Sequence, residues 1–302
     1  MVSSELYPFE GKFLDRNGLK YHYLDEGNGD PLVMVHGNPT WSFYYRNLVL
    51  GLRDQYRTIV PDHIGCGRSD KPDDDRYTYT LESRIDDLEY LLEQLDVLRN
   101  ITLIVHDWGG MIGMGFAHRH PDRIKRLVVM NTAAFPMPKT KNLPPALWWG
   151  RNTALGAILI RGFNAFSATA AHICCKRKPL SKELRDAYTE PYNSWANRIA
   201  TLRFVQDIPL SPKDRSYSIV ADVGANLGQF SETPLLICWG MKDFVFSEQF
   251  LREWQRFLPH GQVHEFNEAG HYVLEDMATE ILGLIREFLA ANPVRVPEPA
   301  LN

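Results

Sequence analysis

An aspartate placed where a strand turns into a helix has the clearest chemical role in this sequence. The segment Ile104-Val-His-Asp-Trp-Gly-Gly110 combines a buried apolar run, a turn eased by glycines and the beginning of a helical stretch. This arrangement is typical of a nucleophile elbow, in which a sharp turn raises a reactive side chain above the edge of a sheet. In the usual pattern Gly-x-Ser-x-Gly, Asp107 takes the serine position and Gly109 the second glycine, while Val105 replaces the first.

A carboxylate in the nucleophile position indicates which kind of bond is attacked. A serine oxygen attacking an alkyl carbon would form an ether that activated water cannot cleave, whereas a carboxylate forms an ester whose carbonyl stays open to water. Asp107 therefore points to a saturated carbon that bears a leaving group, as in an alkyl halide, an epoxide or a strained lactone. The alternative is that Asp107 only caps the following helix, because aspartate is a favoured N-cap.

Two later residues complete a catalytic triad in the chain order nucleophile, acid, histidine. His271 follows a strand and a glycine just before the last predicted helix, where a general base would lie. Asp243 follows a buried strand directly, and its carboxylate would orient the imidazole and stabilise the imidazolium. The other strand end that could supply the acid carries Asn131, which is not acidic, and we interpret Glu268 as a solvated loop carboxylate.

Hydrogen-bond donors are expected from two further positions. The loop after the strand in Met34-Val-His-Gly-Asn-Pro-Thr-Trp-Ser42 and the residue after the nucleophile would donate backbone N–H groups to an oxyanion hole. By position these donors are Asn38 and Trp108. Their side chains, an amide and an indole N–H, are neutral donors that could hold a departing halide and still release it. A plain turn at Asn38 and a core tryptophan are the alternative interpretations.

These residues need a parallel sheet to bring them together. Short, non-alternating runs of Val, Ile and Leu predict strands covered by helices on both faces. Strands that alternate with helical stretches predict a mainly parallel α/β sheet. The segment Leu19 to Glu26 alternates more and predicts an antiparallel opening strand. The predicted parallel strands are Leu32 to His36, Thr58 to Pro61, Ile101 to His106, Leu127 to Met130 and Leu235 to Trp239. The predicted helices are Leu81 to Leu98, Gly109 to His118, Glu248 to Phe257 and Glu275 to Ala290.

The alternation of strands and helices stops between about Ala133 and Lys213. This stretch is rich in Trp, Phe, Ala and Arg, is broken by prolines and shows no clear strand. We interpret it as a helical cap over the carboxyl edge of the sheet, where open parallel sheets bind their ligands. The predicted division is therefore a core of residues 1–132 and 214–292, a cap of residues 133–213 and a loosely ordered tail of residues 293–302.

Composition excludes several other classes of protein. The 302 residues carry a net charge of −4, which argues against general binding to nucleic acid or to an anionic membrane surface. The N-terminus lacks the pattern of a signal peptide, and no apolar run is long enough to span a membrane, so we expect a cytoplasmic protein. Four scattered cysteines, among them the adjacent Cys174 and Cys175, predict free thiols and neither a disulfide framework nor a metal site.

Four motifs carry a resemblance to a known family. They are His-Gly-Asn-Pro-Thr-Trp-Ser (36–42), Asp62-His-Ile-Gly-Cys-Gly-Arg-Ser69, His-Asp-Trp-Gly-Gly (106–110) and Trp-Gly-Met-Lys-Asp (239–243). From Tyr7 to Leu289 the chain resembles a haloalkane dehalogenase of the α/β-hydrolase superfamily. The pairing of an asparagine and a tryptophan with an acid after the later strand resembles the third dehalogenase subfamily. That subfamily also holds the β-lactone decarboxylases of long-chain olefin biosynthesis.

The resemblance implies an α/β-hydrolase fold and a reaction without metal or organic cofactor. The main expectation is hydrolytic dehalogenation of a haloalkane through an ester on Asp107, with Asn38 and Trp108 holding the halide and His271 activating water. The alternative is β-lactone decarboxylation by the same residues. A non-catalytic ligand-binding relative remains a further alternative. Expected partners are a small-molecule substrate and a halide ion, and a homo-oligomer or a complex with a partner enzyme stays open.

An epoxide hydrolase is a less favoured alternative. Epoxide hydrolases resemble this chain in the His-Asp-Trp-Gly motif but usually carry an aromatic residue where this chain has Asn38. They also need two tyrosines from the lid to protonate the epoxide oxygen. Tyr188, Tyr192 and Tyr217 are the available tyrosines, so at the level of sequence only Asn38 speaks against this activity.

Overall fold

A sheet of eight strands forms the centre of the computed structural model, which describes residues 2–294. The strand order is β1-β2-β4-β3-β5-β6-β7-β8, and all strands from β4 to β8 run parallel, whereas β2 is antiparallel to both β1 and β4. The predicted parallel strands and the antiparallel opening strand are confirmed. The strands are β1 (Lys12–Arg16), β2 (Leu19–Glu26), β3 (Pro31–Val35), β4 (Arg57–Pro61), β5 (Ile101–Asp107), β6 (Ile124–Thr132), β7 (Leu235–Gly240) and β8 (Gln262–Phe266).

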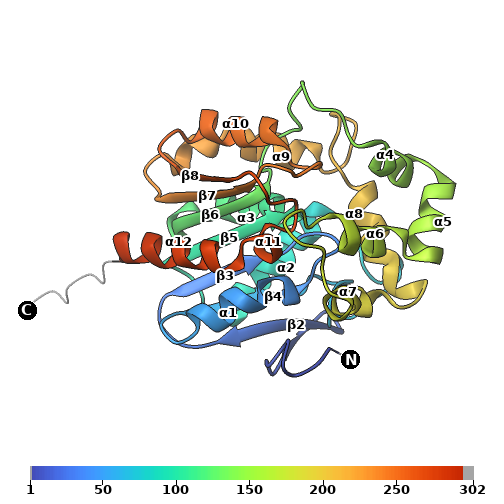
Figure 1. The fold of residues 1–302 in the computed structure, drawn as a ribbon, viewed down its shortest axis with the longest axis horizontal. Helices are drawn as coiled ribbons and strands as arrows, with labels where there is room; N and C mark the ends of the chain where they lie inside the picture. The colour runs from blue at the N-terminus through green and yellow to red at the C-terminus, as the bar shows by residue number, and fades with distance from the viewer. Residues whose placement is uncertain (1, 295–302) are drawn as a thin grey trace, which may run out of the picture.

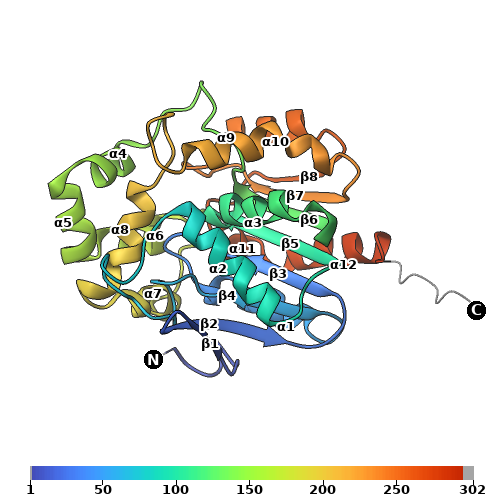
Figure 2. The same ribbon diagram turned by 180° about the vertical axis from the view of Figure 1, so that it is seen from behind.

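Helices cover both faces of this sheet (Figures 1 and 2). One face carries α1 (Arg46–Leu52), α11 (Val273–Asp276) and α12 (Ala278–Ala291), and the other carries α2 (Leu81–Gln94), α3 (Trp108–Arg119), α9 (Tyr217–Ala225) and α10 (Glu248–Phe257). Because successive strand side chains point to opposite faces, each central strand contributes to two apolar clusters. In β5, Leu103 and Val105 belong to one cluster and Ile104 to the other.

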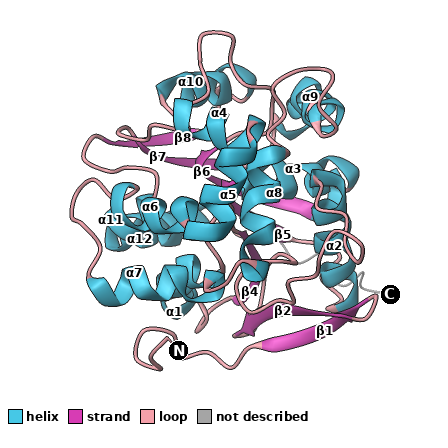
Figure 3. Cartoon of the chain, turned by 90° about the vertical axis from the view of Figure 1, so that its right-hand side faces the viewer, coloured by secondary structure: helices cyan, strands magenta, loops and turns pink. Residues whose placement is uncertain are grey.

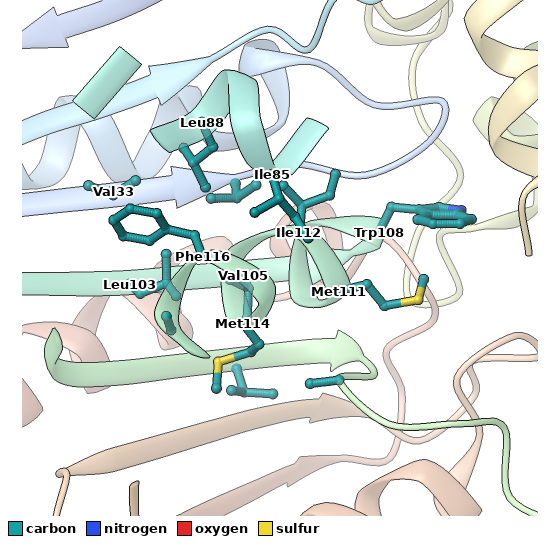
Figure 4. Packing of buried hydrophobic residues seen from close by; sticks show 14 of the residues in the cluster. Val33, Ile85, Leu88, Leu103, Val105, Trp108, Met111, Ile112, Met114 and Phe116 are labelled. Carbon is teal, nitrogen blue, oxygen red and sulfur yellow. The ribbon is translucent and has the colours of Figure 1, made fainter. Parts of the chain in front are cut away.

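Helix α3, which begins at the predicted nucleophile, packs closely on both the sheet and α2. Figure 4 shows Ile112 and Phe116 of α3 beside Ile85 and Leu88 of α2, with Trp108 at the other end of α3. Glycines allow this close approach, because a Cβ on Gly113 would lie 2.7 Å from Cγ1 of Val105. The valine that replaces the first glycine of the elbow pattern is therefore accommodated by a glycine of the next helix.

The predicted helical insertion consists of five α-helices and short 3₁₀ turns, with no strand between β6 and α9. The helices are α4 (Pro145–Asn152), α5 (Ala154–Phe163), α6 (Ala165–Ile173), α7 (Lys182–Thr189) and α8 (Ile199–Gln206). Viewed from this side, α4, α5, α6 and α8 lie in front of the sheet (Figure 3). The boundaries at residues 133 and 213 stay a prediction, and the predicted loose tail lies outside the described residues from residue 295 onwards.

Two predicted helices differ from the structure at their ends. The predicted helix from Leu81 to Leu98 stops at Gln94, since Asp96 adopts a positive φ of 54° that a helix cannot contain. The predicted helix from Glu275 to Ala290 is broken at Met277 into α11 and α12. At the break, Asp276 accepts hydrogen bonds from backbone N–H groups of the cap segment and of the loop before α11, which are contacts that helical periodicity does not reveal.

Asn131, the non-acidic residue at the end of β6, has a structural role. Its side chain donates to the carbonyl oxygen of Gly240 at 3.0 Å and accepts from the N–H of the same residue at 2.8 Å. The side chain is fully buried, so it links β6 to the end of β7, from which the Asp243 loop leaves.

We expect Asn131→Ala to lower the free energy of unfolding by about 1–3 kcal/mol, because it leaves the buried N–H of Gly240 without a partner and removes one of the two hydrogen bonds to its carbonyl oxygen. Urea denaturation followed by circular dichroism measures this loss. Asn142→Ala, at an exposed position, is the matched control and should unfold like the wild type. Equal stability of the two variants would contradict this role of Asn131.

Candidate active site

Asp107 lies at the tip of β5 in a strained backbone conformation, as an elbow requires. Its φ of 53° and ψ of −130° lie outside the regions that non-glycine residues favour. The turn is secured by the hydroxyl of Thr132, which donates to the carbonyl oxygen of Asp107. Although Asp107 precedes α3, its side chain makes no capping hydrogen bond, so the alternative that it only caps the helix has no support in the geometry.

The carboxylate of Asp107 lies against the loop that follows β3. Its Oδ1 accepts a hydrogen bond of 2.6 Å from the backbone N–H of Asn38. A Cβ on Gly37 would come within 1.9 Å of the same oxygen, so only glycine allows the loop to approach the carboxylate this closely. The predicted oxyanion donor on Asn38 is thus in contact with the predicted nucleophile before any substrate is bound.

His271 and Asp243 lie beside Asp107 in the arrangement of a triad. Nδ1 of His271 is 2.8 Å from Oδ2 of Asp243, and Nε2 of His271 is 3.4 Å from Oδ2 of Asp107. Oδ1 of Asp243 accepts backbone N–H groups from Val245 at 2.7 Å and from Phe246 at 3.1 Å. All three members of the triad are buried, so the structure brings together residues that are far apart in the sequence. Within residues 2–294, the hydrogen bonds and ion pairs of the imidazole involve neither the amide of Asn131 nor the carboxylate of Glu268.

The charges of the triad stabilise one another. Burial alone would lower the pKa of His271, but the carboxylates of Asp243 and Asp107 outweigh burial and raise that pKa to about 10. Burial raises the pKa of Asp107, but the hydrogen bond and charge of His271 bring it below its ordinary value. At neutral pH the resting site therefore contains a carboxylate on Asp107 beside an imidazolium on His271.

Two neutral histidines position the backbone of this site, and sequence reasoning gave them no role. Burial and the charge on His271 lower the pKa of His106 to about 3, and its Nε2–H donates to the carbonyl oxygen of His271 at 2.7 Å. Burial lowers the pKa of His36, whose Nδ1–H donates to the carbonyl oxygen of Gly37 at 2.7 Å. The available signal was their position, because each histidine directly precedes an element of the site.

The predicted leaving-group donors, Asn38 and Trp108, both line the cavity next to Asp107. The indole N–H of Trp108 has no hydrogen-bond partner among the described residues, and the ring packs on Phe204 of α8. The amide nitrogen of Asn38 donates to the carbonyl oxygen of Thr201, also on α8, at 3.2 Å. Two neutral N–H groups held in place by the cap thus lie in the wall of the cavity that contains Asp107.

The cavity above Asp107 has a volume of about 410 Å³ and is enclosed between the sheet edge and helices α4, α5, α6 and α8. Its walls are mainly apolar side chains, such as Met111, Phe135, Leu147 and Phe166. Apart from Asp107 and His271, the charged residue among the described lining residues is Lys141, whose Nζ donates to the carbonyl oxygen of Phe244 at 2.9 Å. The site therefore suits a largely apolar molecule with one reactive polar group.

The lid tyrosines required by an epoxide hydrolase are not at this cavity. Tyr188 is buried against Glu275, Tyr192 donates to the carbonyl oxygen of Thr40, and Tyr217 lies on α9. Within residues 2–294, none of these three side chains belongs to the cavity wall. The protonation of an epoxide oxygen by tyrosine therefore has no support in this geometry.

The fold and this triad define an α/β hydrolase, and residues 30–278 match the family model described as the alpha/beta hydrolase fold. The chain belongs to this family. It is 62% identical to a cis-3-alkyl-4-alkyloxetan-2-one decarboxylase of Shewanella oneidensis over 284 residues, which is 94% of this chain and 89% of that protein. It is 32% identical to a haloalkane dehalogenase of Mycolicibacterium paratuberculosis, over 92% of this chain and 91% of that protein.

Solved structures with the same fold include the haloalkane dehalogenase DatA from Agrobacterium tumefaciens C58. The TM-score is 0.86 at 25% sequence identity, and the match covers 96% of this chain and all of DatA. The expected resemblance to haloalkane dehalogenases and the expected fold are thus confirmed. The identities place the chain nearer to the named decarboxylase than to the named dehalogenases.

We expect Asp243→Asn to lower the pKa of His271 from about 10 towards its ordinary value of 6.5, since it removes one of the two carboxylates that hold the proton. Titration of the imidazole carbons by NMR measures this change. Since the folded pKa exceeds the unfolded one, the contribution of His271 to the free energy of unfolding is complete below pH 6.5 and is lost as the pH rises through 10.

The difference in the free energy of unfolding between wild type and Asp243→Asn should therefore shrink as the pH rises from 6.5 to 10. Glu268→Gln removes an exposed carboxylate three positions before His271 and should leave both the titration and the pH profile unchanged. An unaltered imidazole titration in Asp243→Asn would contradict the assignment of the charges.

Proposed function

We propose that this protein decarboxylates cis-3,4-dialkyl oxetan-2-ones, which are β-lactones, to alkenes. The observation that carries the proposal is the pair of Asp107 and His271 at the base of an apolar cavity, in a chain 62% identical to a decarboxylase of this substrate class. The main expectation from sequence, haloalkane dehalogenation, becomes the second candidate, because the named dehalogenase is only 32% identical. The same residues serve both reactions.

The first step opens the ring. An oxygen of Asp107 attacks C4, the saturated ring carbon bound to the ring oxygen, from the side opposite that oxygen. The new bond between Asp107 and C4 forms while the bond between C4 and the ring oxygen breaks, and its electrons leave with the oxygen. The ring oxygen becomes part of a carboxylate on C3, which accepts hydrogen bonds from the side-chain N–H groups of Asn38 and Trp108 at the cavity wall.

The second step releases carbon dioxide and restores the enzyme. The bond between C3 and the carboxylate carbon breaks, its electron pair forms the double bond between C3 and C4, and the bond from C4 to Asp107 breaks. Inversion in the first step places the ester opposite the carboxylate, so an anti elimination keeps both alkyl groups on the same side. A cis lactone therefore gives a cis alkene and carbon dioxide, and no water is consumed.

The charge on His271 distinguishes this route from hydrolysis. When a haloalkane esterifies Asp107, the site loses a negative charge once the halide departs, so the pKa of His271 falls and the neutral imidazole can activate water. When a β-lactone esterifies Asp107, a new carboxylate appears in the cavity as the old one disappears. His271 then stays protonated and cannot take a proton from water, so the ester on Asp107 decarboxylates faster than it is hydrolysed.

We expect turnover of a cis-3,4-dialkyl oxetan-2-one in oxygen-18 water to give alkene and carbon dioxide in equal amounts and to leave Asp107 unlabelled. Gas chromatography and peptide mass spectrometry measure these products. Asp107→Asn should lower kcat by roughly 10³-fold or more, because a neutral amide cannot form the ester. Glu268→Gln is the matched control and should keep full activity. Formation of the β-hydroxy acid, or oxygen-18 in Asp107, would contradict the proposed route.

For the second candidate we expect His271→Ala to accumulate an alkyl ester on Asp107 when it is supplied with a short bromoalkane, since Asp107 attacks without a base but hydrolysis requires one. Intact-protein mass spectrometry detects the added alkyl group, and His260→Ala, an exposed histidine, is the control. Absence of both bromide release by the wild type and an adduct in His271→Ala would rule out dehalogenation and leave the lactone assay unaffected.

A further inference from the structure

The outer face of helix α5 is apolar where a surface helix is normally polar. Leu155, Ile158 and Phe163 point away from the protein, with exposed fractions of 54%, 47% and 73%. The buried positions of the same helix, Gly156 and Ile160, are apolar as well, so α5 is apolar both where it is buried and where it is exposed. Large exposed apolar surfaces mark contacts with partners or membranes. We define the exposed apolar side chains of α4 to α6 as the cap patch, namely Trp148, Trp149, Leu155, Ile158, Leu159, Phe163 and Ile173.

The entrance to the catalytic cavity opens within the cap patch. Trp149, Leu159 and Ile173 are each at least 40% exposed, yet each also lines the cavity that contains Asp107. These three side chains come from α4, α5 and α6, so each of three cap helices contributes an apolar residue that reaches both the cavity and the surface. A molecule that passes from the patch into the cavity therefore contacts apolar side chains along its whole path.

The segment of sequence that contains the cap patch carries charges of one sign. Residues 133–178, which contain the whole patch, include seven Lys and Arg residues and no Asp or Glu, although the complete chain has a net charge of −4. Arg151 and Arg177 form ion pairs with Asp214 and Glu280 from outside this stretch. The other five form no ion pair within the described residues, and they are Lys139, Lys141, Arg161, Lys176 and Lys178. Apolar side chains with exposed tryptophans, together with basic residues in the same segment, are the composition of a surface that binds an anionic bilayer.

We propose that the cap patch docks on an anionic phospholipid bilayer, so that the catalytic cavity opens directly into the lipid phase. The whole-chain charge predicted no such binding, because that average hides a basic segment within an acidic protein. Docking itself is independent of the reaction. The consequence for substrate rests on the proposed function: a lactone with two long alkyl chains enters from the bilayer, and the apolar alkene returns to it.

The contact is interfacial and leaves the fold intact. No single helix among residues 2–294 is long and apolar enough to cross a bilayer, and the pair α5 and α6, which passes that test jointly, bends by 73° between the two helices. Ile160 and Ala170 of this pair are packed inside the protein, so only the outer side chains are available to lipid. Insertion of such side chains to the depth of the headgroups is typical of monotopic proteins.

Flotation of the full-length protein with vesicles tests the proposal. The vesicles contain three parts phosphatidylcholine and one part phosphatidylglycerol, and pure phosphatidylcholine vesicles serve as the comparison. We expect wild type to float with the anionic vesicles and the variant L155S/I158S/F163S to bind on the order of tenfold more weakly or less. Raised salt and removal of phosphatidylglycerol should each weaken the binding of the wild type several-fold.

The variant F13S/L50S/L98S changes three exposed apolar side chains far from the cap and should bind vesicles like the wild type. Phe163→Glu adds a single charge at the most exposed position and should reduce binding without disturbing the fold, as melting curves would verify. Three outcomes would overturn the proposal. They are no flotation of the wild type, equal flotation of both triple variants, and equal binding of the wild type to neutral and anionic vesicles. Concentration-dependent dimerisation that is lost in L155S/I158S/F163S, without vesicle binding, would assign the patch to a second copy of the chain.

A short-chain lactone in solution and a long-chain lactone in vesicles separate this proposal from the proposed function. L155S/I158S/F163S should process the short lactone at the wild-type rate, because none of its three substituted side chains lines the cavity. It should process the vesicle-borne lactone several-fold more slowly. Flotation without any lactone turnover would retain docking and reject the decarboxylase, whereas equal rates on both substrates would reject entry from the bilayer.

Discussion

One buried negative charge organises the active site. The carboxylate of Asp107 has been taken out of water, which would ordinarily favour its protonated and unreactive form. The backbone N–H of Asn38 and the imidazolium of His271 offset that cost, and together they keep the pKa of Asp107 below its ordinary value. The carboxylate is thus ionised, poorly hydrated and fixed in direction before substrate arrives, and these two contacts hold the loops that carry Asn38 and His271 against it.

The surrounding polar groups keep the positive charge on a single histidine. Burial keeps His106 and His36 neutral, so each donates a hydrogen bond that holds a carbonyl group next to the site in place. Asp243 in turn is held by two backbone N–H groups, which fix the carboxylate that orients His271. A second imidazolium near Asp107 would compete for the leaving carboxylate or halide and slow its release. The neutral state of His106 and His36 is therefore as important as the opposite charges of Asp107 and His271.

Much of the fold and the triad could be predicted because both follow from local pattern. Apolar runs mark buried strands, and Asp107, Asp243 and His271 each follow the end of such a run. The break at Met277 could not be predicted, since it depends on contacts between Asp276 and distant backbone groups. The exposed apolar side of α5 could not be predicted either. The spacing of apolar residues shows which faces of a helix are apolar, but it does not show which of these faces another element covers. Sequence reasoning preferred the haloalkane as substrate, whereas the identities to known proteins favour the lactone. The two substrates call for the same residues and differ only in where the leaving charge goes.

The cap must meet two requirements, which are to exclude water from the cavity and to let an apolar product leave. These requirements conflict unless the inner and the outer surface of the cap face different surroundings. Its inner surface must exclude water, because the fate of the ester depends on which charges remain next to His271, and bulk water would screen them. An enclosed apolar chamber, however, releases an apolar product into water only slowly, since an apolar molecule such as the alkene of the proposed reaction is more stable inside than outside. A cap whose outer surface is also apolar removes this conflict when it faces lipid, because the product then leaves one apolar environment for another. The continuity of apolar side chains from Phe166 in the cavity to Leu159 at its mouth and Leu155 on the surface gives that route a physical basis.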